Sequence, residues 1–252
     1  MPESLTNHWS FYLCKVNDQL ASIYLNLGLR SAVPIVSKPW LLWIWVYFNS
    51  PRPDGLSSNE EAPVLYKIED ALTRNLSASC GALLAGRITT SGRREFYFYG
   101  ENQDGFRNAV TEAMNAFAAY RFDIKEERDP LWEQYLDVLF PNERQMETIK
   151  NRRVLDVLEE HGDVHSVPRL VRHWIYFSTE DTRSAFRDAA LGSGFTIDAE
   201  RLVDGSEPFG LIIAREEPVD QNGIDRTVTE LTRMAQQFGG DYDGWETQVV
   251  NQ

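Results

Sequence analysis

The sequence has few cysteines and no long apolar segment, and each scarcity excludes a class of protein. Only Cys14 and Cys80 occur in 252 residues. Because a disulfide framework needs more cysteines, two thiols predict a reducing compartment. The most apolar run, residues 40–48 (WLLWIWVYF), is far shorter than the roughly 20 residues that a membrane-spanning helix requires. We therefore expect free thiols and no membrane span.

Basic residues are also scarce, with 25 Lys and Arg against 38 Asp and Glu, a net charge of −13 and a pI of about 4.8. Phosphate groups bind to basic surfaces, so this balance argues against broad electrostatic binding to nucleic acid or anionic lipid. An acidic surface instead attracts a basic protein partner. The charge is uneven: the chain up to Gln145 has a net charge of −4, and the chain from Met146 onward has −9.

The N-terminal sequence MPESLTNHWS has no basic segment followed by an apolar stretch, so a secretory leader is not expected. Hydrophobic residues make up 42% of the chain and charged residues 25%, as in ordinary globular proteins with a core. Together with the absence of a long apolar run, these features predict a cytoplasmic protein.

Residues 1–141 have the pattern of a hairpin followed by strand, helix, strand, strand, helix and strand. The Asn17-Asp18 pair suits a tight turn between strands at 7–16 and 19–27. The other elements are expected at 40–49 (strand), 60–77 (helix), 82–90 and 93–99 (strands), 103–119 (helix) and 120–126 (strand). This is the split βαβ order of ferredoxin-like folds. Residues 131–139 (LWEQYLDVL) fit a helical turn or an edge strand equally well.

Residues 142–252 repeat the same order after a helix that Asn142 caps and Gly162 ends. The elements are expected at 173–178 (strand), 179–191 (helix), 195–203 and 209–215 (strands), 224–238 (helix) and 245–250 (strand). We therefore predict an α+β protein with two tandem ferredoxin-like (βαββαβ) units, the first with an extra N-terminal β-hairpin. The free sheet faces can be covered by the other unit or by a second copy in a homodimer.

Motifs for catalysis, cofactors or metals are absent from the sequence. His161 and His165 have a helical spacing, but Gly162 lies between them and no HExxH pattern exists. There is no GxSxG elbow and no Walker loop, and residues 192–194 (GSG) are too short for a dinucleotide fingerprint. We expect no catalytic, cofactor-binding or metal-binding residues, and therefore no enzyme.

Aromatic residues on the predicted strands suggest a second class of function. Ferredoxin-like RNA-binding modules stack bases on exposed rings, and Tyr97, Tyr99 and Tyr176 are candidates. The basic and aromatic signature of such modules is absent, however, so packing against the sheet is the favoured interpretation. Direct nucleic-acid binding is not expected.

The most distinctive local string is residues 242–247 (YDGWET). Asp243 and Gly244 predict a kink or bulge at the start of the last strand, and Trp245 supplies a large anchor against the core. Tyr242, Gly244 and Trp245 are therefore predicted to be structural anchors.

This string, preceded by an amphipathic helix, resembles the end of the bacterial regulator of ribonuclease E activity, protein B, family. Residues 151–162 (NRRVLDVLEEHG) look like the opening helix of that family, and 172–178 (RHWIYFS) and 194–197 (GFTI) are similar to its first two strands. The resemblance covers about residues 148–250. The N-terminal unit resembles a domain family of unknown function that is found joined to such regulators.

The resemblance implies a non-enzymatic regulator that binds and inhibits an RNase E-type endoribonuclease and so modulates RNA decay. The acidic C-terminal unit would bind a basic protein partner. The candidate partner-binding residues are Asp241, Asp243, Glu246, Glu216 and Glu217. The alternative is a small-molecule-binding protein or enzyme with a pocket between the two units.

Overall fold

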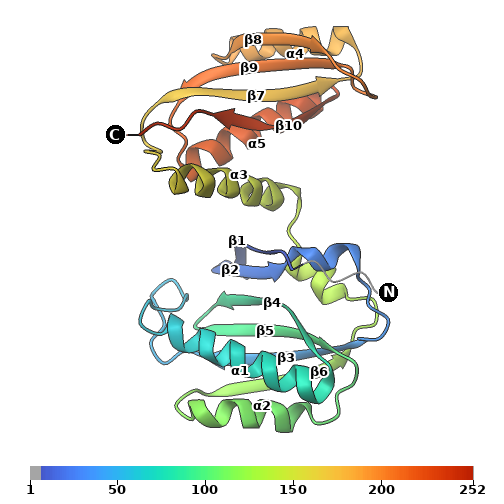
Figure 1. Ribbon diagram of the computed structural model, residues 1–252, viewed down its shortest axis with the longest axis vertical. Helices are drawn as coiled ribbons and strands as arrows, with labels where there is room; N and C mark the ends of the chain where they lie inside the picture. The colour runs from blue at the N-terminus through green and yellow to red at the C-terminus, as the bar shows by residue number, and fades with distance from the viewer. Residues whose placement is uncertain (1–6, 252) are drawn as a thin grey trace. The chain divides into compact units, whose positions relative to one another are not determined.

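The computed structural model describes residues 7–251 and divides into two compact units, Met1–Gln145 and Met146–Gln252 (Figure 1). Each unit has its own antiparallel sheet and its own hydrophobic core. Among the described residues, none of the helices combines the length and the apolar character needed to cross a membrane. We keep 1–141 and 142–252 as the proposed domain limits.

The first unit contains a six-stranded antiparallel sheet in the order β1-β2-β4-β5-β3-β6. Its strands are β1 (Trp9–Val16), β2 (Gln19–Asn26), β3 (Trp40–Tyr47), β4 (Leu83–Thr90), β5 (Arg93–Gly100) and β6 (Phe122–Arg128). The order β4-β5-β3-β6 is the ferredoxin-like arrangement, and the β1–β2 hairpin extends the sheet beyond β4. The predicted α+β class and the N-terminal hairpin are confirmed.

Two tight turns have the left-handed backbone that two-residue hairpins require. Asn17 and Asp18 have φ values of 49° and 63°, and Ser91 and Gly92 have values of 49° and 75°. Both turns therefore lie where the sequence predicts them. They set the register of the two hairpins.

Helices α1 (Ala62–Cys80) and α2 (Phe106–Met114) cover one face of the first sheet (Figure 1). The helically spaced residues of α1 are fully buried against Phe96 and Phe98 of β5. These α1 residues are Leu65, Ile68, Leu72 and Leu76. The helix runs three residues past its predicted end because the left-handed residue Gly81 (φ 57°) terminates it. Short 3₁₀ turns occur at Leu27–Ser31 (η1) and Asn115–Phe117 (η2).

Part of the second face of this sheet, around Tyr99, is covered by the segment whose structure the sequence leaves open. It forms a π-helical turn, Gln134–Leu139 (η3), preceded by Trp132, which stacks on Tyr99 with ring centroids 3.7 Å apart. Asp129 accepts hydrogen bonds from the Tyr99 hydroxyl (2.5 Å) and from the backbone N–H of Glu133 (2.9 Å). The carboxylate of Asp129 thus fixes both the turn and the ring on which it packs.

The burial of these tyrosines decides between base stacking and sheet packing. Tyr97 is 5% exposed and Tyr99 is 0% exposed. Tyr97 contacts Trp43 edge-on, and its hydroxyl donates to Glu95 (2.5 Å). A role for these two rings in stacking RNA bases is therefore excluded, and the favoured packing interpretation is confirmed for them.

The second unit contains a four-stranded antiparallel sheet in the order β10-β7-β9-β8. Its strands are β7 (Arg169–Phe177), β8 (Thr196–Leu202), β9 (Phe209–Glu217) and β10 (Gly240–Thr247), and its helices are α4 (Glu180–Gly192) and α5 (Gln221–Gln237). Helix α3 (Glu143–Glu160) comes before β7. The predicted βαββαβ order is confirmed for this unit.

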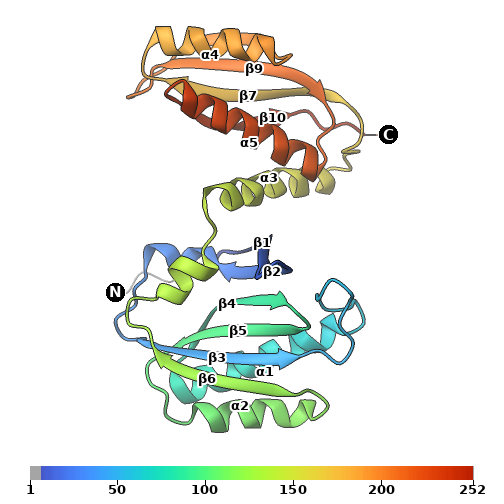
Figure 2. The same ribbon diagram turned by 180° about the vertical axis from the view of Figure 1, so that it is seen from behind.

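The helices of this unit start at side-chain caps and bury one stripe each. Asn142 and Gln145 exchange two 2.9 Å hydrogen bonds at the start of α3, a reciprocal capping box. Thr179 caps α4 and Asp220 caps α5. Helices α4 and α5 lie across one face of the sheet (Figure 2), with their apolar stripes packed against Ile175 and Phe177 of β7.

Strand β10 starts at Gly240, five residues before the predicted start at Trp245. A Cβ atom on Gly240 would lie 2.3 Å from the ring of Phe177, so only glycine allows the strand to pair there. The predicted bulge occurs between Tyr242 and Gly244, within the strand rather than at its start. The sequence shows the bulge, but the clash that demands Gly240 is visible only in the fold.

Replacing Trp132 tests the covering of the second face. Trp132→Ala is expected to lower the free energy of unfolding of the first unit by about 3–5 kcal/mol, because it removes a fully buried ring. Urea unfolding, monitored through hydrogen exchange of the β5 amides, measures this loss of free energy. Leu131→Ala, at a neighbouring side chain that is 60% exposed, should change it by less than about 0.5 kcal/mol. Equal effects of the two substitutions would contradict the assignment.

Candidate functional site

The side chains of β7 alternate between the two faces of the second sheet, and the two faces differ in burial. His173, Ile175 and Phe177 are buried on the helix side, so the side chains between them lie on the opposite face. The register with β9 places Ile212 opposite Trp174 on that face. We call this surface the open face; its central residues are Leu170, Arg172, Trp174, Tyr176, Ile212 and Ala214. None of them belongs to the clusters that α3, α4 and α5 cover.

Three of the predicted acidic residues flank the open face. By strand register, Asp241 lies opposite Tyr176, Glu246 opposite Arg172 and Glu216 opposite Leu170. All three carboxylates are exposed. Asp243 is exposed as well and lies at the bulge of β10.

The basic side chains of this face do not balance its acids. Arg172 donates a 3.1 Å hydrogen bond to Asp198 of β8, so its charge is already paired. Arg201 lies opposite Gly210 at the β8 edge. The open face therefore presents partly exposed aromatic rings within a surface of negative balance.

Glu217 is placed differently from its neighbour Glu216, because consecutive strand residues point to opposite faces. Its carboxylate accepts hydrogen bonds from the Arg215 guanidinium (2.7 Å) and the Thr227 hydroxyl (3.1 Å). The Nε2 atom of His173 lies 3.6 Å from its second oxygen. Glu217 thus takes part in a half-buried polar network beneath α5, and its role in partner binding stays a prediction.

His173 links this network to the last strand. Its Nδ1 atom lies 2.9 Å from the Tyr242 hydroxyl, and the imidazole is completely buried. Burial lowers the pKa of His173, although the neighbouring Glu217 carboxylate opposes this shift. Burial by itself would raise the pKa of Glu217, but His173 and Arg215 together lower it. Burial raises the pKa of Tyr242, which keeps its hydroxyl protonated.

Trp245 joins β10 to two helices. Its half-buried ring packs against the cluster that contains Leu155 and Leu158 of α3. Its Nε1 atom donates a 2.8 Å hydrogen bond to Asn151, which in turn donates to Asp225 of α5 (2.8 Å). Asn151 is 2% exposed, and nothing in its local sequence marks it as a partner of Trp245.

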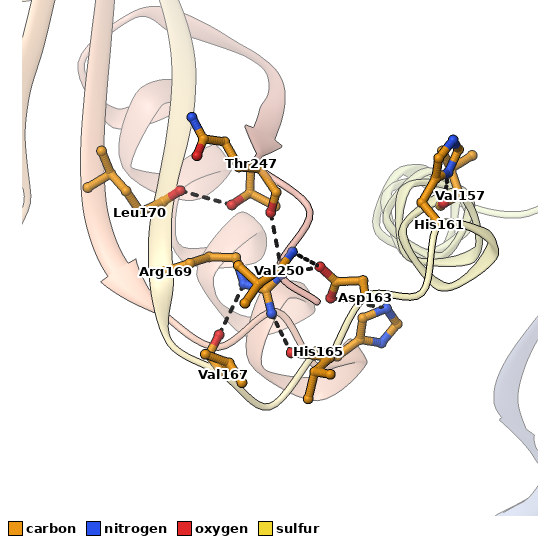
Figure 3. A network of polar contacts seen from close by, with 11 residues as sticks. Val157, His161, Asp163, His165, Val167, Arg169, Leu170, Thr247 and Val250 are labelled. Carbon is orange, nitrogen blue, oxygen red and sulfur yellow. Dashed lines mark hydrogen bonds and ion pairs between the residues drawn. The ribbon is translucent and has the colours of Figure 1, made fainter. Parts of the chain in front are cut away.

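Figure 3 shows how the segments after α3 and after β10 are tied together. Asp163 accepts hydrogen bonds from the Arg169 guanidinium and from the backbone N–H of Val250 (2.7 Å). His161 contacts the Val157 carbonyl of its own helix, whereas His165 lies 3.8 Å from Asp163. These contacts are structural. Within residues 7–251, no three His, Cys, Asp or Glu side chains are grouped so that they could hold a metal ion.

The fold and these surfaces define a two-unit α+β protein with ferredoxin-like topology in each unit. Residues 7–140 match a family model described as a family of unknown function (DUF695), and residues 148–247 match the model of the regulator of ribonuclease activity B. Since the first match covers more than half of the chain, the protein belongs to the DUF695 family. It also carries a C-terminal regulator of ribonuclease activity B domain. The resemblances found in the sequence are thus confirmed.

The other comparisons add little. A crystal structure of an unknown protein from Galdieria sulphuraria covers 84% of this chain and 99% of its own, with 14% identity and a TM-score of 0.22. A TM-score that low supports no structural argument. No curated protein matches the chain.

Trp245 can be tested as an anchor by a substitution that removes its hydrogen bond. Trp245→Phe leaves the buried oxygen of Asn151 without its donor and should cost about 1–3 kcal/mol of unfolding free energy. Trp174→Phe on the open face is the matched control and should cost less. Chemical denaturation measures both. If Trp245→Phe kept full stability but lost a protein partner, Trp245 would be an interface residue instead.

The buried imidazole predicts a pH dependence. The pKa of His173 is lower in the folded chain than its ordinary value of 6.5, so the unfolded chain takes up the proton first. Stability is therefore complete above pH 6.5 and falls below it, by at most about 1.4 kcal/mol per pH unit.

Urea unfolding of the second unit at pH 7.5 and 5.5 should show this loss. His173→Phe should remove this part of the pH slope, whereas His161→Gln should keep it. A slope that survives in His173→Phe would assign the effect to another group.

Proposed function

We propose that this protein is a non-enzymatic, cytoplasmic regulator that binds an RNase E-type endoribonuclease, inhibits it and thereby modulates RNA decay. The match of residues 148–247 to the regulator of ribonuclease activity B supports the class of function. The open face supports the mode of action, because it offers a binding surface and needs no catalytic group. The function of the N-terminal unit is not part of this proposal.

The observation that carries the proposal is the combination of acids and aromatic rings on the open face. Asp241, Glu246 and Glu216 supply negative charge at its margins, while Trp174 and Tyr176 are partly exposed at its centre. Lys and Arg side chains of a partner would pair with the carboxylates and stack on the rings. A basic segment of the nuclease therefore fits this surface better than RNA, whose phosphates the carboxylates repel.

Charge reversal at the margins tests the proposal. The double variant Asp241→Lys, Glu246→Lys should weaken binding to the host's RNase E at least about tenfold and relieve inhibition of RNA cleavage. Glu230→Lys, an exposed position on α5 across the sheet, is the control and should retain both activities. Pull-down at low salt and a cleavage assay provide the measurements.

Two results would refute the proposed partner. One is the absence of binding at low salt, where electrostatic attraction is strongest. The other is equal loss of binding in the double variant and in Glu230→Lys. If the chain instead formed a homodimer that the double variant dissociates, the open face would be a self-association surface.

A further inference from the structure

The N-terminal hairpin creates a pocket that the ferredoxin-like part of the first unit alone would lack. The pocket has a volume of about 380 Å³ and lies on the helix-covered side of the sheet. Ser22 and Tyr24 of the hairpin form one wall, β4 and β5 form its base, and the start of α1 with the preceding loop forms the other wall. Its size falls in the range of small-molecule sites, roughly 300–1,000 Å³.

Two arginines from adjacent strands line this pocket although they are almost fully buried. Arg87 of β4 is 8% exposed and Arg94 of β5 is 4% exposed. The Arg87 guanidinium forms an ion pair with Glu69 of α1 and lies 4.2 Å from the centre of the Tyr24 ring. The charge of Arg87 is therefore balanced within the fold.

Arg94 forms no direct ion pair of this kind among the described residues. Its Nε atom donates a 3.2 Å hydrogen bond to the Thr89 hydroxyl, and its Nη1 atom has no hydrogen-bond partner among the described residues. Burial, together with the like charge of Arg87, lowers the pKa of Arg94 to about 10, so it remains a cation at neutral pH. The Glu69 carboxylate and the Tyr66 ring, whose centre lies 5.2 Å from the guanidinium, offset part of this charge without a direct hydrogen bond to it. The Nη1 donor is therefore buried and unsatisfied, which is costly unless a ligand supplies an acceptor.

The rest of the lining is suited to an anion. No carboxylate lines the pocket among the described residues, and a third arginine, Arg52, lies at its edge, where it pairs with Asp54. Ser22, Ser58 and Asn59 add hydroxyl and amide donors. The positive end of the α1 dipole lies at the same wall.

We infer that this pocket of the DUF695 unit binds a small molecule through an oxyanion group, a phosphate or a carboxylate, with Arg94 as the counter-charge. This inference is independent of the ribonuclease proposal, because the pocket is formed entirely by the first unit. The donors of the wall complete the coordination of the oxyanion, and Arg87 stays paired with Glu69 when the ligand binds.

Calorimetric titration of the full chain tests the inference, with inorganic phosphate, adenosine monophosphate and benzoate as probes at constant ionic strength. At least one probe should bind saturably with one site per chain. Arg94→Met should weaken that binding about 10- to 100-fold, the loss of one or two hydrogen bonds to a charged group. It should also leave the melting temperature unchanged or higher, because a buried charged donor without a hydrogen-bond partner is removed. Arg74→Met, an exposed arginine of α1 outside the pocket, should change neither.

A second variant keeps all three arginines. Ser22→Phe fills the pocket from β2 and should block binding, so it decides the question if Arg94→Met does not fold. Preference for phosphate and the nucleotide over benzoate would identify a phosphorylated ligand, and the reverse preference a carboxylate; both support the inference. Failure of all three probes to bind, or binding that neither variant weakens, would overturn it.

Discussion

The stacking of Trp132 on Tyr99, held by the carboxylate of Asp129, covers part of the sheet face that the helices of the first unit leave free. A ferredoxin-like sheet buries one face under its helices and leaves the other to be covered. In the first unit the segment before and within η3 covers the part of this face around Tyr99, which becomes a core residue. In the second unit Trp174 and Tyr176 of β7 remain partly exposed, as do Trp43 and Trp45 of β3, the equivalent strand of the first unit. The same topology thus leaves rings partly exposed in both sheets, and the first sheet is covered only where η3 packs on it.

The two units also differ in how their buried charges are paired. In the second unit, Glu217 and Arg215 pair with each other beside His173, and the network is bonded to the helix through Thr227. Such a network holds β7, β9 and α5 in register. In the first unit, Arg94 forms no direct ion pair, and its Nη1 atom has no hydrogen-bond partner among the described residues. We therefore associate the second unit with surface recognition and the first with a pocket.

Much of this architecture follows from local signals. The sequence predicts the hairpin turns, the apolar stripes of the helices and the Asn142 cap, because the residues that cause each feature lie close together in the chain. Other features depend on how the strands pair and which face of the sheet each side chain occupies. Glu216 and Glu217 look like one solvated acidic pair, but strand alternation sends them to opposite faces of the sheet. Arg87 and Arg94 lie on the two strands that a two-residue turn joins, so the sequence is enough to predict that they share a sheet face. The sequence does not predict that the β1–β2 hairpin forms a wall beside them or that Arg87 pairs with Glu69.

By itself, the sequence determined the class of the fold, the order of its elements, the family of each half and the acidic balance of the C-terminal unit. These properties depend on periodicity, turn chemistry and composition, which are all local. Only the tertiary structure decided the conformation of residues 131–139, the start of β10 at Gly240, the burial of Tyr99 and the unsatisfied Nη1 donor of Arg94. The reason is physical: burial and charge pairing depend on which distant segments meet, and strand alternation does not say what lies above a face.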